Sequence, residues 1–369
     1  MSRTVVLLAP VANVGALVRT RKIASVLSRE GLDILHVAWK RDPAEPDNEP
    51  PIATRTVLEG GGYKNRALIR WYLRYMAGLR RALRDLPAGS DVYALSLWSA
   101  HPAASLARKR RVNLFFDDND TLSLAYPWPK PVRPVIARME RRAAAAARIH
   151  LVPSAARWPS ADPNLRVVPN YPLTDDLGRA KEIARSKGYG RDGTFTLYVN
   201  GWLAPTRGLD SLVRALEVYD GPSFRVLLAG RIDPTVPQAA RLMEHPFAEY
   251  LGEVTPAESL ALYHRAHACL TLYDPSLAIN RLAESNKWGD CVLTRCAILV
   301  NEEVATAQPY LEVGGAAAVP YGDPSALAAL LRRWAQNPNE PLEMGARLAR
   351  LPFRPWDEAM SALVREWLG

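Results

Sequence analysis

The sequence predicts an α/β fold built from two Rossmann-like, doubly wound domains. The chain has 369 residues, more than one hydrophobic core normally serves. Its first half alternates short apolar runs with helical patterns, and the same alternation starts again near residue 194. A strand, a helix and a second strand within about thirty-five residues imply parallel pairing, so each series predicts its own parallel sheet.

The first series contains five runs of strand length and three helical patterns. The strand candidates span residues 5–9, 34–39, 92–97, 113–116 and 149–152. The helical patterns span 19–29, 64–86 and 134–148, and Gly31 marks the end of the first. Pro-rich loops at 41–51 and 126–134 lie near strand ends, where an acceptor could dock.

The second series follows a polar break at residues 174–193. Its strand candidates span 195–199, 224–229, 250–252, 268–272 and 297–300, with a helix over 208–218. Ligands of doubly wound sheets bind at the carboxyl ends of the strands, so we expect the site in a cleft between two facing domains.

Composition narrows the class of protein. A hydrophobic fraction of 48% with 23% charged residues is typical of a folded globular chain. No apolar run reaches the roughly 18 residues of a membrane span, and residues 4–9 are better explained as a strand than as a signal peptide. Three cysteines without ligand spacing fit a reducing cytoplasm. The net charge of +9 favours nucleotides, lipid headgroups or nucleic acid as partners, without choosing among them.

Two strand-to-helix turns of the second domain could hold phosphate. In the first, Gly201 allows close backbone approach, and Arg207 precedes a helix whose N–H groups attract anions. In the second, Ser285 could cap a helix that begins with Asn286 and Lys287, and Asp290 would lie about one turn along, placed to bind a ribose diol. Taken singly, each is equally consistent with an ordinary turn that carries solvated charges.

The order of these segments resembles retaining GT-B glycosyltransferases of family 4. The segments that carry the resemblance in the second half are 199–208, 227–231, 250–253, 285–290 and 297–300. In the first half, residues 17–31 are similar to the first helix of that family and 167–172 to its strand-end motif before the linker. Trp356 and Asp357 resemble the aromatic–acidic pair of its C-terminal segment, which crosses back to the first domain. The resemblance covers nearly the whole chain.

The resemblance implies separate roles for the two domains. Residues 1–175 would form an acceptor-binding domain, 190–350 a nucleotide-sugar-binding domain, and 351–369 a helix that packs back on the first. Arg207 matches the cation that binds the donor diphosphate, and Asp290 matches the second acid of a paired motif, which holds the ribose. Ser285, Asn286 and Lys287 match the loop that contacts the phosphates. Gly230 and Arg231 match the strand end beside the nucleotide, and Gly252 to Val254 match the segment near the base.

Two departures from the family pattern concern the sugar and the acceptor. The first acid of the paired motif falls at Leu282, which cannot bind a sugar hydroxyl. Glu284 or Asp274 could substitute for it, although neither stands at the expected spacing. The His–acid pair after the third or fourth strand is replaced by Asp118-Asn119-Asp120, without the histidine.

Candidate catalytic residues are Asp118, Asp120 and Glu284. The first two follow a buried-looking strand, where a carboxylate could act as an acceptor-side base. Close carboxylates would raise one another's pKa if poorly solvated. A solvated loop in which an aspartate caps a helix is the open alternative. We expect no metal and no separate cofactor, because no further ligand donors can be identified and GT-B enzymes resemble metal-independent catalysts; the donor would be a UDP- or GDP-linked sugar.

A helix with a basic stripe is predicted over residues 64–86. Five arginines recur at intervals of three, four or seven and share one face: Arg66, Arg70, Arg74, Arg81 and Arg84. Basic helices with aromatic residues are typical of membrane-surface elements, so we expect contact with an anionic membrane, on the inner face of the cell membrane. The alternative is a packed surface helix in an arginine-rich protein. Nucleic acid is not expected, because no stacking pattern accompanies the charge.

The sequence therefore predicts transfer of a sugar from a nucleotide donor to an acceptor hydroxyl, in polysaccharide or lipid-linked glycan synthesis. Two alternatives stay open. An epimerase or hydrolase of the same fold would consume nucleotide sugar without an acceptor. A non-catalytic partner in a membrane glycan complex would have lost its donor site, as Leu282 allows.

Overall fold

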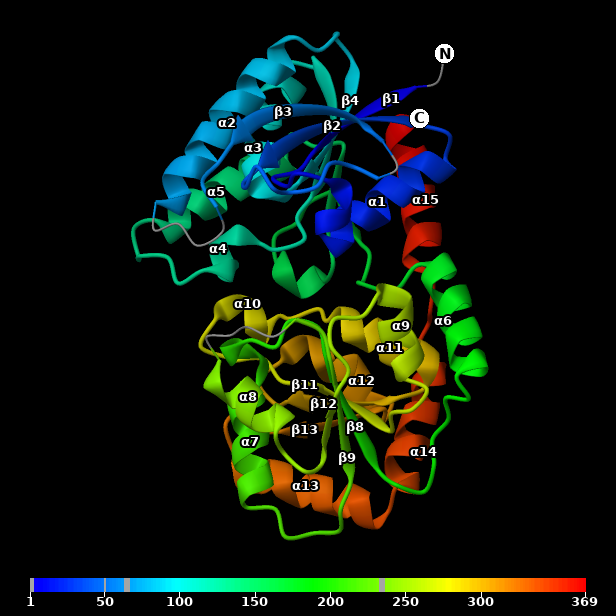
Figure 1. The fold of residues 1–369 in the computed structure, drawn as a ribbon. Coiled ribbons are helices and arrows are strands. Elements are labelled where there is room, and N and C mark those ends of the chain that lie inside the picture. The colour runs from blue at the N-terminus through cyan, green and yellow to red at the C-terminus, as the bar shows by residue number, and fades with distance from the viewer. Residues whose placement is uncertain (1–2, 50, 63–66, 232–235) are drawn as a thin grey trace. The chain divides into compact units, whose positions relative to one another are not determined.

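A computed structural model describes residues 3–49, 51–62, 67–231 and 236–369. The chain divides into two compact units, one formed by residues 1–168 with 357–369 and the other by residues 169–356. Each unit has a parallel sheet and a hydrophobic core of its own (Figure 1). The α/β fold with two Rossmann-like sheets, expected from the sequence, is confirmed.

Unit 1 is built on a parallel sheet with the order β3-β2-β1-β4-β5-β6-β7. This order reverses direction at β1, as in doubly wound folds. The strands are β1 Thr4–Leu8, β2 Asp33–Lys40, β3 Ala53–Glu59, β4 Ser90–Leu95, β5 Val112–Asp117, β6 Ile149–Val152 and β7 Leu165–Val167.

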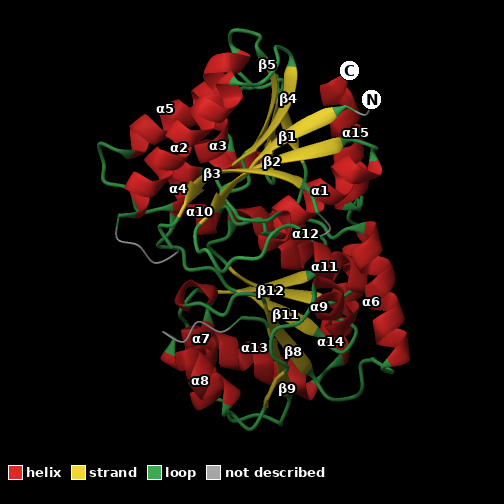
Figure 2. Cartoon of the chain, turned by 45° about the horizontal axis from the view of Figure 1, so that its top comes forward, coloured by secondary structure: helices red, strands yellow, loops and turns green. Residues whose placement is uncertain are grey.

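Helices cover both faces of this sheet (Figure 2). On one face lie α2 (Leu68–Arg84), α3 (Ser96–Ala107) and α5 (Arg133–Ala144), with the short α4 (Leu122–Ala125) packed on α5. On the other face lie α1 (Val18–Arg29) and α15 (Trp356–Leu368). Two short 3-10 turns belong to unit 1, η1 Val14–Ala16 and η2 Ala155–Arg157, and a third, η3 Pro205–Arg207, belongs to unit 2.

Helix α15 belongs to unit 1 although it follows all of unit 2 in the sequence. The fully buried Trp367 packs edge-on against Phe115, with ring centroids 5.4 Å apart. Asp357 forms an ion pair with Arg29 of α1, and Arg365 donates to both carboxylate oxygens of Glu30. The expected C-terminal helix that crosses back to the first domain is therefore present.

Unit 2 repeats the same topology, with the strand order β10-β9-β8-β11-β12-β13. The strands are β8 Thr196–Asn200, β9 Arg225–Ala229, β10 Ala248–Tyr250, β11 Ala268–Thr271, β12 Ala297–Asn301 and β13 Ala316–Val319. All of their pairings are parallel, so their carboxyl ends share one edge of the sheet.

Two helical layers enclose the sheet of unit 2. One face carries α7 Leu209–Glu217, α8 Pro237–Met243 and α13 Pro324–Gln336. The other carries α6 Thr174–Ser186, α9 Pro256–Leu262, α11 Asn286–Thr294 and α12 Gln308–Glu312. Helix α14 Asn339–Arg347 contacts β11, β12, α11 and α13. The remaining short elements are α10 Ala278–Arg281, η4 Ala305–Ala307 and η5 Leu348–Arg350.

The polar break predicted at residues 174–193 contains helix α6. Its first turn carries Asp175 and Asp176, which suit the positive end of a helix dipole. The buried Ala180 and Ala184 face the core of unit 2. Small alanines give a weak hydrophobic signal, so the charged positions around them dominate the sequence pattern.

Candidate functional site

Three glycines at strand ends of unit 2 bring their backbones together. Gly201 follows β8, Gly230 follows β9, and Gly252 lies beyond β10. The N–H of Gly201 donates to Ala229 and that of Gly230 donates to Gly252, at 2.9 and 2.8 Å. A Cβ at Gly230 would lie 2.2 Å from the carbonyl oxygen of Gly201, so no larger residue fits without movement. At this point the sheet edge therefore has backbone atoms that no side chain covers.

The N-terminus of α11 lies beside this glycine contact. Ser285 is the N-cap, and its Oγ accepts a hydrogen bond from the N–H of Lys287 at 3.3 Å. The Lys287 side chain extends toward β8, where its Cε lies 3.8 Å from the position of a Cβ on Gly201. An ammonium group, the positive end of a helix and an accessible backbone thus converge, which is the arrangement that attracts phosphate.

Arg207 closes the turn between β8 and α7. The next residue, Gly208, has φ +75°, and a Cβ there would lie 2.5 Å from Leu272 Cβ. This close packing holds the turn against the end of β11. The Arg207 guanidinium lies 4.9 Å from the ring centroid of Tyr273, and the N–H of Asp274 donates to the carbonyl of Thr206 at 3.2 Å. Arg207 is therefore held at the carboxyl edge of the sheet by the residues that follow β11.

Helix α11 is braced from two sides. The fully buried Trp288 donates from its indole to Thr271 Oγ1 at 3.0 Å. The segment that precedes α6 packs on the start of the helix: Asn170 Nδ2 donates to the carbonyl of Glu284, and Tyr171 lies so close to Gly289 that a Cβ there would be 2.4 Å from the ring. The strand-end motif 167–172 thus helps to set the position of Ser285 and Lys287.

The other predicted donor-site residues occupy the same edge or its margins. Asn286 and Arg231 are exposed, and Arg231 adjoins residues 232–235, which lie outside the described part of the chain. Asp290 is half-buried on α11, where its charge contributes to the raised pKa values of the buried Tyr198 and Tyr263, after the larger effect of burial. Val254 packs partly buried against the core beneath the edge.

Glu284 faces a different part of unit 2. Burial, followed by the charge of Glu284, raises the pKa of Tyr310, and Glu284 also contributes to the raised pKa of Tyr171. Its carboxylate therefore lies toward these tyrosines of α12 and the 169–172 segment. Leu282, at the position of the expected acid, follows α10 and is half-buried.

In unit 1, Asp117 and Asp118 are both fully buried, whereas Asp120 is exposed. Asp117 accepts two hydrogen bonds from Arg19 of α1, at 2.8 and 2.9 Å, and one from the phenol of Tyr93. This charged pair ties α1 to β5. Of the two predicted acceptor-side acids, Asp120 is the one whose side chain reaches solvent.

Asp118 has a histidine neighbour that sequence reasoning missed. His150 of β6 lies with its Nε2 3.8 Å from Asp118 Oδ2, and its Nδ1 lies 2.8 Å from Asp162 Oδ2. Strands β5 and β6 pair with Phe116 opposite His150, so the histidine sits one strand away from the acids rather than beside them in sequence. Only the register of that strand pair could have revealed this contact.

Glu140 of α5 completes the buried acidic group. Its Oε1 accepts a hydrogen bond from the N–H of Ser123 at 2.9 Å. Burial and the nearby charge of Asp118 raise the pKa of Glu140 to about 7. Within the described residues, no cluster of three or more His, Cys, Asp or Glu side chains has an arrangement suited to a metal ion.

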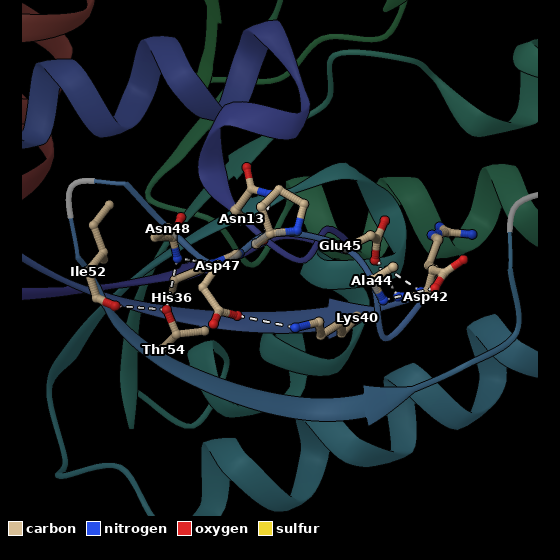
Figure 3. Close-up of polar contacts among 12 residues, drawn as sticks. Asn13, His36, Lys40, Asp42, Ala44, Glu45, Asp47, Asn48, Ile52 and Thr54 are labelled. Carbon is tan, nitrogen blue, oxygen red and sulfur yellow. Dashed lines mark hydrogen bonds and ion pairs between the residues drawn. The ribbon is translucent and has the colours of Figure 1, made fainter.

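The Pro-rich segment after β2 is held by its own polar contacts (Figure 3). Asn48 is at the centre: its Oδ1 accepts from the N–H of Val14 at 2.7 Å, and its Nδ2 donates to Thr54 Oγ1 at 2.8 Å. Asn13 donates to the carbonyl of Pro46, and Lys40 pairs with Asp47. These bonds fasten the loop to the turn after β1 and to β3, giving the carboxyl edge of unit 1 a defined surface.

Helix α2 carries the basic stripe on its outer side. Arg70, Arg74, Arg81 and Arg84 are exposed, and Arg66 lies outside the described residues. The opposite side of the helix buries Tyr75, Met76, Leu79 and Leu83 in the core. In the part of the chain that the structure describes, no helix combines the length and the apolar character needed to span a bilayer.

Comparison with known proteins was made by sequence and by structure. No protein-family model and no curated protein sequence matches the chain. Solved structures do match over nearly its whole length. Sucrose-phosphate synthase from Thermosynechococcus elongatus is 16% identical, covers 99% of both chains and has a TM-score of 0.69. The Anabaena protein HepE, in complex with UDP and glucose, is 12% identical over 99% of this chain and 98% of its own, with a TM-score of 0.68.

A third match is a protein described as a UDP-N-acetylglucosamine 2-epimerase from Listeria monocytogenes, 11% identical over 100% of this chain and 97% of its own, with a TM-score of 0.64. The chain has the GT-B fold. At these identities the likeness establishes the architecture of two Rossmann-like domains, and the GT-B fold serves both glycosyltransferases and an epimerase.

Proposed function

We propose that the protein is a glycosyltransferase that moves a sugar from a nucleoside-diphosphate donor to an acceptor hydroxyl. The observation that carries the proposal is the convergence at the edge of unit 2: the Gly201–Gly230 backbone contact, Lys287 beside Gly201, and the Ser285-capped start of α11. HepE, which has the same fold, was crystallised with UDP, with UDP and glucose, and with UDP-glucose. A UDP- or GDP-linked sugar is the donor class that fits this site.

In this proposal, unit 2 holds the donor and stabilises the leaving group. When the glycosidic bond to phosphate breaks, negative charge grows on the departing diphosphate. Lys287, Arg207 and the N–H groups of α11 would offset that charge without a metal. Asp290 would accept hydrogen bonds from the ribose. Transfer with retention of configuration is part of the proposal and rests on the resemblance to family 4.

Unit 1 would supply the acceptor side. Asp120 is exposed after β5 and is the candidate base or hydrogen-bond acceptor for the attacking hydroxyl. Asp118 would support Asp120 without touching the acceptor, since the Asp118 carboxylate is buried beside His150. Glu284 of unit 2 stays the third catalytic candidate, although its carboxylate lies toward Tyr171 and Tyr310.

We also propose that unit 1 binds the anionic inner face of the cell membrane and that the acceptor is a glycan or a lipid-linked glycan. Helices α2 and α5 carry nine exposed arginines and, within their described residues, no exposed acid; these are Arg70, Arg74, Arg80, Arg81, Arg84, Arg133, Arg138, Arg141 and Arg142. The aliphatic Ile69 and Leu73 are exposed among them, at 45% and 52%. Burial, then the charges of Arg80, Arg108 and Arg142, lower the pKa of His101, so arginines of α2, of α5 and of the end of α3 lie near this histidine.

The deciding experiment compares Arg207→Ala and Lys287→Ala with Arg214→Ala, an exposed arginine paired with Asp210 on α7. Binding of UDP, GDP and their sugar conjugates is measured by calorimetry, and transfer by product analysis with glycan and lipid-linked acceptors. We expect the first two variants to lose at least 100-fold in turnover and the control to keep it. Near-normal turnover in both site variants would refute the proposal.

Incubation without an acceptor tests the alternative chemistry. A transferase leaves the nucleotide sugar largely intact under these conditions, whereas an epimerase or hydrolase consumes it. The epimerase among the structures of this fold makes this control necessary. Failure to bind any nucleoside diphosphate would instead favour a non-catalytic partner.

A further inference from the structure

The position that should hold the donor sugar carries Leu282, so a different group must bind the sugar hydroxyls if the donor site is intact. Such a group should lie at the carboxyl edge of unit 2, close to the proposed diphosphate site. It should also have a carboxylate oxygen that the fold does not already use, because sugar hydroxyls donate their strongest hydrogen bonds to ionised acceptors.

Asp274 meets the first condition. It follows β11 and is tied to the Arg207 turn by the bond from its N–H to the Thr206 carbonyl. Its own carbonyl accepts a hydrogen bond from Asn280 Nδ2 at 2.8 Å. Since the neighbouring Tyr273 ring lies against the Arg207 guanidinium, the backbone of residues 273–274 and the proposed phosphate ligand are held side by side.

Asp274 also meets the second condition. Its Oδ1 accepts from the N–H of Ser276 at 2.9 Å, which fixes the orientation of the carboxylate. Among the residues that the structure describes, its Oδ2 has neither a hydrogen-bond donor nor an ion-pair partner, and the side chain is partly exposed. One oxygen thus orients the group while the other is available to a ligand.

Two other acids near this edge, Glu303 and Glu284, have contacts elsewhere. Glu303 accepts from Asn301 Nδ2 at 2.7 Å and from the N–H of Tyr321. Glu284 faces the tyrosines of α12 and the 169–172 segment. Neither has a backbone bond to the Arg207 turn.

We infer that Asp274 binds the hydroxyls of the donor sugar and takes the place of the acid missing at Leu282. The inference rests on the proposed function and assigns the sugar, rather than the nucleotide, to β11. An acidic acceptor selects for hydroxyls in a fixed orientation, so Asp274 would distinguish hexoses that differ at one hydroxyl.

Asp274→Asn tests this assignment, because the amide oxygen can still accept from Ser276 while the negative charge is lost. The control is Glu302→Gln, an exposed acid that follows β12 on the same edge. Calorimetry with UDP and UDP-glucose, and with GDP and GDP-mannose, gives the ratio of the dissociation constant of each sugar conjugate to that of its nucleoside diphosphate.

We expect Asp274→Asn to bind the nucleoside diphosphate within about twofold of wild type, while the ratio rises by about tenfold or more, the loss of one charge-assisted hydrogen bond. Glu302→Gln should keep the wild-type ratio. An unchanged ratio in Asp274→Asn, or equal weakening of both ligands, would overturn the assignment while leaving the proposed function in place. Wild-type protein that binds neither pair of ligands would overturn both.

Discussion

At the scale of single residues, buried titratable groups make the stability of unit 1 depend on pH. His36 is fully buried on β2, and its Nδ1 lies 3.4 Å from Asn48 Nδ2. Burial lowers its pKa from 6.5 to about 4. The unfolded chain therefore binds the proton first, so the contribution of neutral His36 is complete above pH 6.5 and is lost as pH falls toward 4.

His36→Asn should reduce this acid sensitivity. Between pH 7 and pH 5 the wild-type free energy of unfolding should fall by about 2 kcal/mol through His36, whereas the variant should lack that part of the slope. Urea unfolding of unit 1, followed at both pH values, measures it. The same pH slope in both proteins would show that His36 does not titrate as its burial requires.

Glu140 should act in the opposite direction. Its folded pKa of about 7 lies above the ordinary 4.5, so the protonated form stabilises the fold; this contribution is complete below pH 4.5 and is lost as pH rises through 7. Glu140→Gln keeps an oxygen for the N–H of Ser123. The free energy of unfolding of this variant should match that of wild type near pH 4.5 and exceed it by about 3 kcal/mol at pH 8, as measured by denaturant unfolding. Asp118→Asn, which removes the neighbouring charge, should give part of the same gain.

At the scale of elements, two glycines with positive φ allow a matched comparison. Gly230 has φ +125° and contacts the Gly201 backbone, whereas Gly252 has φ +76° and open space around its Cβ position. Alanine at Gly252 should cost about 1 kcal/mol of strain. Alanine at Gly230 should cost more and should weaken binding of UDP or GDP at least tenfold, because the β8 and β9 ends must move apart. Thermal unfolding with calorimetry compares them, and equal effects would argue against a tight backbone contact.

Helix α2 should bind anionic vesicles through its exposed face. Arg74→Gln/Arg81→Gln/Arg84→Gln removes three charges, and Ile69→Ser/Leu73→Ser removes the exposed aliphatic groups. Each of these basic residues near a surface contributes about 1 kcal/mol, so the arginine variant should bind vesicles with 30% phosphatidylglycerol at least tenfold more weakly. Lys181→Gln/Arg185→Gln on α6 is the charge control. Cosedimentation that is equal for all proteins would contradict membrane contact by α2.

Elements were predictable where burial leaves a strong pattern. The apolar strands β1, β2, β5, β6, β8, β9, β11 and β12 were located within one or two residues. Strand β3 was missed because the first four of its seven residues, Ala53 to Thr56, are exposed and are polar or small. The predicted strand over 92–97 ends at Leu95, because Ser96 has φ +67° and starts α3. Helix α3 was missed because buried Leu97, Ala100 and Ala103 leave it apolar on most sides.

At the scale of the whole molecule, each unit fully buries a tryptophan from one of its late helices. Trp367 of α15 is fully buried in unit 1, and Trp334 of α13 is fully buried in unit 2. Trp367→Ala should lower the free energy of unfolding of unit 1, and Trp334→Ala that of unit 2, each by about 3–5 kcal/mol. Scanning calorimetry separates the two transitions.

UDP at a hundred times its dissociation constant should raise the free energy of unfolding of unit 2 by about 2.7 kcal/mol. If UDP shifted only the transition of unit 1, the nucleotide would bind unit 1, which would contradict the proposed site in unit 2.

The candidate site was predictable in its local parts and not in its long-range contacts. Ser285 and Lys287 could be predicted because the N-cap serine, the start of the helix and the lysine are adjacent in the sequence. The packing of Tyr171 on Gly289 joins residues more than a hundred positions apart, and His150 meets Asp118 only through the register of two strands. No sequence pattern encodes such distances, since they depend on how the sheet is assembled.

The placement of α15 also determines the order in which the protein can fold during synthesis. Unit 2 is continuous in the chain, whereas unit 1 needs residues 357–369, which leave the ribosome only after all of residues 169–356. At about 5–20 residues per second, this delay lasts roughly 10 to 40 seconds. During that time, the surface of Phe115 and Tyr93 that Trp367 later covers is open to chaperones. The nascent chain is therefore expected to complete its second domain before its first.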